Sequence, residues 1–175
     1  MFDELRAIYL RGEVDPEAAE KVCIELLKME AKDDAKDITM MIDSPGGDVA
    51  SGFAIIDTMH VVSPDVETIC VGMCCSMAAL ILAGGAKGKR KSLAHGRIMM
   101  HQPLAGGINN AQTTDVQIIA RELERQRSEC YGYLSQVTGK SVSRIAEDNE
   151  RDCWMTAGEA RDYGLIDEII TQKDR

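Results

Sequence analysis

Strand-like and helix-like segments alternate along the first half of the sequence, and this alternation constrains the fold more than any other feature. Residues 7–11 and 38–43 are short strand-like segments, and residues 66–71 (VETICV) have the continuous apolar character of a strand buried on both faces. A segment with helical periodicity follows each of them. Because strand, helix and strand in short steps require parallel crossovers, the sequence predicts an α/β fold.

The first helix is expected to begin at Asp15, a capping residue followed by a proline at the first helical position. Gly12 is expected to begin the turn that precedes it. The apolar residues of this helix recur at helical spacing and form one stripe. They are Ala19, Val22, Cys23, Leu26 and Leu27.

The second strand is expected to stop at the motif SPGG, residues 44–47, after which a second helix begins. A third helix carries Ser76 and leads to a strand over residues 96–101. The second helix presents an apolar face that is made of Val49, Phe53, Ile55, Ile56 and Met59.

The second half of the chain begins with a glycine-rich polar interruption at residues 104–112, followed by a long helix. The apolar stripe of this helix is too long for one small domain to cover, so we expect a partner subunit to cover its exposed end. The 175 residues contain no obvious linker and are expected to form one domain. Near-heptad spacing, broken by Arg127, relates Val116, Ala120, Leu123, Cys130, Leu134 and Val137.

The charge of the chain argues against nucleic acid and anionic membranes as partners. The net charge is −9, whereas both partners require a basic face. The single basic cluster, residues 87–91 (KGKRK), is too short to change this conclusion. No apolar run reaches the length of a membrane span, and the amino-terminal residues MFDELR have no secretory signal.

Cysteine usage indicates a reduced, cytoplasmic protein. The six cysteines include no CxxC pair and no cysteine–histidine spacing suited to zinc. We therefore expect no metal and no cofactor.

Ser76 is a candidate nucleophile because it opens an apolar helix directly after a strand. Backbone N–H groups at such a helix start point toward developing negative charge. The alternative is a core serine that hydrogen-bonds to its own helix. The GxSxG motif of the α/β-hydrolases is absent around it.

A serine nucleophile needs a base and a group that orients the base. His60 ends an amphipathic helix and His95 lies in an expected turn, whereas His101 closes a strand, at the edge where α/β active sites gather. A satisfied structural histidine remains the alternative for His101.

Spacing alone does not choose the orienting acid, because Asp148, Glu150 and Asp152 lie close together in EDNERD. The glycines of SPGGD let the backbone turn tightly and approach a ligand, so their N–H groups are candidate oxyanion donors or partners for an extended peptide. An ordinary strand-to-helix turn is the alternative.

Four motifs together resemble the proteolytic subunit family of Clp proteases (ClpP). They are SPGGDVASGFAIIDTM, SMAALILAGGAKGKR, RIMMHQPL and ERDCWMTAGEARDYGLIDEII, in the family's order. The resemblance extends from Ile8 to Ile170. It implies a crotonase-like, ClpP-type α/β fold of repeated βαβ units with a protruding strand–helix handle. It also implies serine endopeptidase activity on unfolded proteins and peptides, within two stacked heptameric rings.

Residue by residue, the resemblance places the family's nucleophile on Ser76, its base on His101 and its orienting acid on Asp152. It places the oxyanion donors on the backbone N–H groups of Gly47 and Met77.

The resemblance further implies a head over residues 1–103 and 140–175 and a handle over 104–139. Substrate would lie as an added strand between Gly47, Asp48 and Val49 on one side and Leu104, Ala105 and Gly106 on the other. Contact between rings would be made by Gln112, Asp115, Glu150 and Arg151.

The sequence departs from the family pattern in three respects. The family's axial loop precedes the position of Met1, so we expect it to be missing here. Aromatic positions of the family's docking pocket fall on Thr39, Met41 and Lys91, which predicts weak or altered docking of an AAA+ unfoldase. Cysteines near the expected active site suggest either simple packing or a thiol-sensitive centre; these are Cys74, Cys75 and Cys153.

Three other interpretations compete with an active peptidase ring. One is a non-catalytic or conditionally active ring subunit that needs a paralogue, although all three triad positions are intact. Another is a crotonase-type acyl-CoA enzyme, which shares the fold but does not need the triad. The last is a phage-type capsid maturation protease.

Overall fold

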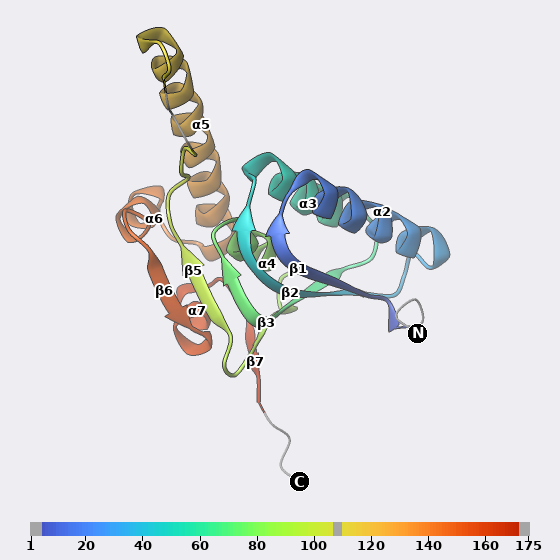
Figure 1. Cartoon of the computed structure of the whole chain (residues 1–175). Helices are drawn as coiled ribbons and strands as arrows, with labels where there is room; N and C mark the ends of the chain where they lie inside the picture. The colour runs from blue at the N-terminus through green and yellow to red at the C-terminus, as the bar shows by residue number, and fades with distance from the viewer. Residues whose placement is uncertain (1–4, 107–109, 172–175) are drawn as a thin grey trace.

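The computed structural model describes residues 5–106 and 110–171, in which strands and helices alternate as predicted (Figure 1). The strands form one mixed sheet, and most of its ladders are parallel. The α/β prediction is therefore confirmed. In chain order the elements are β1 (Ala7–Val14), α2 (Pro16–Lys32), β2 (Ile38–Gly47), α3 (Val49–Val61), β3 (Val66–Cys75), α4 (Met77–Ala83), β4 (Arg90–Leu93), β5 (Arg97–Met100), α5 (Thr113–Thr138), α6 (Val142–Asp148), β6 (Cys153–Thr156), α7 (Ala157–Tyr163) and β7 (Glu168–Ile170).

The sheet branches at β3. Its main path runs in the order β1-β2-β3-β4-β7, and β3 pairs with β4 through residues 68–70. The following residues 73–75 of β3 pair with β5 instead, and β5 pairs with β6 in the antiparallel sense. The carboxyl-terminal end of β3 therefore lies next to β5, at the edge of the sheet where the candidate site residues lie.

Two strand breaks that the sequence predicts, at Gly12 and at the SPGG motif, are wrong. β1 continues through Gly12, whose φ of 85° accompanies a register shift against β2, and it ends only at Val14. β2 continues through the SPGG motif to Gly47, because the lengthened β1 supplies a partner for both glycines. Pairing with a neighbouring strand has overridden the local turn signal.

β3 also differs from its prediction. It extends to Cys75, and its side chains alternate between full and partial burial instead of being buried on both faces. Thr68 and Cys70 face the helices, while Glu67 and Ile69 lie on the less covered face.

Helices α2 and α3 pack against each other along one face of the β1–β3 region (Figure 1). Asp15 caps α2 as predicted, with its carboxylate accepting a hydrogen bond from the N–H of Ala18 at 2.7 Å. Leu27 was wrongly placed in the buried stripe, since it is 49% exposed, whereas Met29 is buried. The buried positions of α2 are 19, 22, 26 and 29.

Helix α5 rises from the sheet, and its amino-terminal end lies farthest from the rest of the chain (Figure 1). Its buried residues, Cys130, Tyr131 and Leu134, lie toward its other end, whereas Val116 and Ile118 are exposed. Within the described ranges, none of the helices has the length and apolar character that crossing a bilayer requires.

Candidate active site

Ser76 occupies a sharp turn between β3 and α4. Its φ of 54° and ψ of −125° lie outside the regions that residues with a side chain favour. Its N–H donates to the carbonyl of Met99 at 2.8 Å, which ties the turn to β5. The local geometry is thus a strained strand–turn–helix, of the kind that exposes a nucleophile, although the GxSxG motif is absent.

Gly46 supplies the room that this turn needs. A Cβ atom at Gly46 would lie 2.5 Å from the carbonyl oxygen of Cys75, 2.8 Å from Cβ of Ser76 and 2.9 Å from the backbone nitrogen of Met77. Only a residue without a side chain fits there, and its φ of 92° also favours glycine. The end of β2 therefore packs directly on the turn that carries Ser76.

His101 lies beside Ser76 because β5 pairs with the end of β3. Cys75 is opposite Met99 in this parallel ladder, and His101 follows the last residue of β5. The Nε2 atom of His101 lies 2.8 Å from Oγ of Ser76. The imidazole is mostly covered, with 16% of its side chain exposed.

Asp152 is the member of the EDNERD segment that meets His101. The antiparallel pairing of β5 and β6 sets Met100 opposite Cys153, so the preceding Asp152 lies next to His101. Its Oδ1 is 3.3 Å from Nδ1 of His101, and its side chain is 60% exposed.

The two other candidate acids have different neighbours. Asp148 forms an ion pair with Arg144 at 2.9 Å and accepts a hydrogen bond from the hydroxyl of Tyr163 at 2.8 Å. The backbone carbonyl of Glu150 accepts a hydrogen bond from the side chain of Gln102. Contact with His101 therefore distinguishes Asp152, which spacing could not do.

Gln102 and Asn149, which are not among the site residues predicted from the sequence, hold the segment of Asp152 against the end of β5. The N–H of Gln102 donates to the carbonyl of Asn149 at 3.1 Å, and its Nε2 donates to the carbonyl of Glu150 at 3.2 Å. Asn149 is fully buried, with Nδ2 donating to the carbonyl of Ile145 at 2.8 Å. The one sequence signal for this contact was that Gln102, a polar residue, directly follows His101.

Comparison with known proteins shows the family of this chain. A sequence model of the Clp protease family matches residues 1–173. The chain belongs to the Clp protease family. It is 44% identical over 168 residues to "ATP-dependent Clp protease proteolytic subunit" from two strains of Bacteroides fragilis, one of them YCH46. The matches cover 96% of this chain and 80% and 76% of the two relatives.

The two other histidines of this Clp protease lie elsewhere. His60 is exposed near the end of α3, and its Nε2 lies 3.1 Å from the carbonyl oxygen of Gly84. His95 lies in the turn between β4 and β5, also as expected.

The glycine pair of the SPGG motif and Met77 adjoin the turn that carries Ser76. Met77 begins α4 and is buried, and Gly47 follows the glycine that packs on the backbone of Met77. Asp48 caps α3, and its carboxylate accepts hydrogen bonds from the N–H and the hydroxyl of Ser51 at 2.8 and 2.7 Å. The hydroxyl of Ser51, followed by its N–H, lowers the pKa of this carboxyl group.

Exposed backbone flanks the site on both sides. Gly47 and Asp48 are exposed and Val49 is half-buried, at the junction of β2 and α3. The stretch that leaves His101, Leu104, Ala105 and Gly106, is also exposed.

The residues assigned to ring contact fall into two separate places. Gln112 and Asp115 are at the amino-terminal end of α5, the end farthest from the sheet (Figure 1). Glu150 and Arg151 are exposed between α6 and β6, beside Asp152. Within the described ranges, no hydrogen bond or ion pair joins the first pair to the second.

The thiols near the site are covered. Cys74 and Cys75 are buried, and Cys153 is half-buried. Burial raises the pKa of all three thiols, most strongly for Cys74. The neutral thiol therefore prevails at neutral pH, which works against the thiol-sensitive interpretation.

Positions expected to dock an unfoldase carry polar groups that engage one another. Nζ of Lys91 lies 2.7 Å from Glu67 and 3.4 Å from Glu168, and the hydroxyl of Thr39 donates to Glu67 at 3.1 Å. A polar row thus crosses four neighbouring strands on the less covered face of the sheet, beside the half-buried Met41.

Proposed function

We propose that this Clp protease is a serine-type endopeptidase in which Ser76 is the nucleophile, His101 the base and Asp152 the orienting acid. The observation that supports this most is the 2.8 Å separation of His101 Nε2 and Ser76 Oγ, within reach for proton transfer. The strained backbone of Ser76 supports the same role.

In the proposed mechanism, Ser76 Oγ forms a bond to the scissile carbonyl carbon while its proton passes to Nε2 of His101. A carboxylate only accepts hydrogen bonds, so Asp152 favours the tautomer with the proton on Nδ1 and leaves Nε2 free to accept. His101 then returns the proton to the leaving amine. Water repeats the sequence on the acyl-enzyme, with His101 as its base.

The negative oxygen of the tetrahedral intermediate needs donors that are already in place. We assign this role to the backbone N–H groups of Gly47 and Met77. The close packing of Gly46 on Met77 supports this assignment, because it fixes one backbone segment against the other.

We assign the substrate to the space between residues 47–49 and 104–106, where it would lie extended and pair with both segments. Their exposure, on either side of Ser76 and His101, supports this assignment. Backbone pairing is independent of side chains, which suits a peptidase for unfolded proteins.

We propose that the chain assembles into two stacked heptameric rings, in which residues 104–139 form the handle between rings and the remainder forms the head. The exposed apolar residues Val116 and Ile118 on the outer part of α5 support a second copy, or a paralogue, as their partner. Ring contacts are assigned to Gln112, Asp115, Glu150 and Arg151.

We further propose an AAA+ unfoldase as a partner with weakened or altered docking, because the curated relatives are named ATP-dependent and the docking positions are polar here. Free cysteines support a reducing, cytoplasmic location.

A covalent serine probe tests the chemistry without any assumption about substrate. A fluorophosphonate should label the purified chain at Ser76, and His101→Ala should slow labelling by about 10²-fold or more, since base catalysis contributes that much. Ser92, a buried serine outside the site, offers the control variant Ser92→Ala. Labelling that persists in Ser76→Ala would refute the assignment.

A further inference from the structure

The carboxyl-terminal end of α4 is fixed by side chains from neighbouring elements. A helix leaves its last carbonyl groups without partners inside the helix. Here the carbonyl of Leu82 accepts a hydrogen bond from Thr68 Oγ1 of β3 at 2.7 Å. The carbonyl of Gly84 accepts one from His60 Nε2, at the end of α3, at 3.1 Å.

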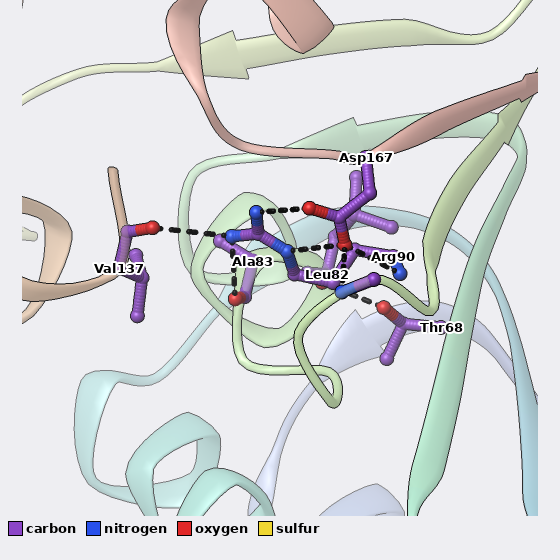
Figure 2. A network of polar contacts seen from close by, with 7 residues as sticks. Thr68, Leu82, Ala83, Arg90, Val137 and Asp167 are labelled. Atoms are coloured by element: carbon purple, nitrogen blue, oxygen red, sulfur yellow. Dashed lines mark hydrogen bonds and ion pairs between the residues drawn. The ribbon is translucent and has the colours of Figure 1, made fainter. Parts of the chain in front are cut away.

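Arg90 binds the carbonyl between these two and reaches two other elements as well (Figure 2). Its Nη1 donates to Ala83 of α4 at 3.4 Å and to Val137, near the carboxyl-terminal end of α5, at 3.3 Å. Its Nε and Nη2 donate to Asp167, which precedes β7, at 2.9 and 2.6 Å. One guanidinium group therefore joins α4, α5, β4 and the start of β7.

Arg90 is the positive charge among three negative features. The carboxyl-terminal ends of α4 and α5 carry partial negative charge, and Asp167 carries a full one. Burial alone would raise the pKa of Asp167, but hydrogen bonds from Arg90 and its positive charge hold that pKa below the ordinary range. Arg90 itself is only 6% exposed. Without the guanidinium group, the two helix ends and the carboxylate would repel one another.

The other end of α4 carries Ser76 and Met77. All seven residues of this helix are buried, so it packs as a rigid unit, and its length is about 10 Å at 1.5 Å per residue. A displacement of the carboxyl-terminal end of α4 would therefore also displace the hydroxyl of Ser76 at its other end.

We propose that Arg90 is a positioning residue that transmits the position of α5 to Ser76 through α4. The inference rests on the proposed function, in which α5 contacts the second ring. Through this junction, docking of α5 on its partner would fix the nucleophile and the adjoining N–H group of Met77 in their reactive positions.

Three variants separate this role from ordinary stabilisation. Arg90→Gln removes both the positive charge and the planar set of guanidinium donors, whereas Arg90→Lys keeps only the positive charge. Lys89→Met is the matched control, because Lys89 lies next to Arg90 and pairs with Asp37 and Asp65 instead of the helix ends.

Peptide hydrolysis should respond through kcat. Arg90→Gln should lower kcat by about ten- to hundredfold, because a small displacement of reacting groups costs that much, with KM changed by less than about threefold. Arg90→Lys should recover part of the loss, and Lys89→Met should stay near wild type. A folded Arg90→Gln protein with kcat within about twofold of wild type, or an equal loss in Lys89→Met, overturns the proposal.

Hydrogen exchange by mass spectrometry tests the junction without catalysis. Arg90→Gln should speed exchange in α4 and in the carboxyl-terminal turns of α5 together, whereas Thr68→Val should speed it in α4 alone. Acceleration confined to one helix in the arginine variant contradicts the proposal. If Arg90→Gln does not fold, Arg90→Lys decides by the same comparison. If the wild-type protein shows no turnover that depends on Ser76, the proposed function is refuted. The exchange measurements still test whether Arg90 links α4 to α5.

Discussion

The Nδ1 atom of His101 lies 3.3 Å from Oδ1 of Asp152, a carboxylate with 60% of its side chain exposed. This separation is slightly longer than the usual range for a hydrogen bond, whereas the contact of His101 with Ser76 is well within it. In water the charge of Asp152 attracts an imidazolium ion less strongly than a buried carboxylate would.

Asp152→Asn should therefore lower kcat by about 10- to 10³-fold, less than the roughly 10⁴-fold loss typical of a triad with a buried aspartate. The measurement is kcat for a short peptide, with Asp148→Asn as the control, because Asp148 contacts Arg144 and Tyr163 instead of His101. An equal loss in the two variants would show that Asp152 has no special role.

Gly46→Ala should abolish peptide hydrolysis and destabilise the fold, because the new Cβ atom would lie within 3 Å of the turn around Ser76. Gly12→Ala is the matched control, since Gly12 also has a positive φ but has nothing within 4 Å of its Cβ position. Gly12→Ala should cost only the strain of the left-handed conformation, about 1–2 kcal/mol, and should keep activity. Thermal unfolding measures the change in stability of each variant, and kcat measures its activity. Comparable activity in the two variants would contradict this account.

Iodoacetamide at neutral pH should leave activity and oligomeric state unchanged. Burial raises the pKa of Cys75 and Cys153, so their thiolates form only at a pH above that of an ordinary thiol, about 8.5. Alkylation of these residues should therefore accelerate at higher pH than alkylation of free cysteine. Mass spectrometry locates the adducts, and inactivation at pH 7 that tracks modification of Cys75 would disprove the prediction.

An AAA+ unfoldase should stimulate protein degradation weakly at most. An apolar docking loop would have to displace the contacts of Lys91 with Glu67 and Glu168, and charged groups are costly to bury without partners. Titration of a host Clp ATPase, with ATP and a labelled protein substrate, measures the effect. Saturable stimulation would contradict the prediction.

The residues of the proposed triad lie together as the sequence led us to expect, whereas several strand ends do not fall where it predicts. Helix periodicity and motifs led to Ser76 and His101, which the structure brings into contact. Proline and glycine are turn residues, so the SPGG motif predicts the end of a strand, yet β1 pairs with both glycines and β2 extends to Gly47. Such pairing joins distant parts of the chain and leaves no local signal.

The same limit applied to Asp152 and Arg90. The choice among Asp148, Glu150 and Asp152 depends on the register between β5 and β6, which sets the residue that lies beside His101. In the sequence Arg90 belongs to the short basic cluster at residues 87–91, whereas in the structure its side chain is buried among helix ends and Asp167. The family resemblance singled out Asp152, which lies beside His101 in the structure, but it gave no role to Arg90.

The most direct test of the central claim is cleavage of a short fluorogenic peptide by the purified protein and by Ser76→Ala, with assembly followed by analytical ultracentrifugation. The account predicts turnover by a large ring assembly, lost on substitution while the assembly is kept. Turnover that survives in Ser76→Ala, or an assembled ring that shows none, would contradict the claim that this chain is itself a serine peptidase.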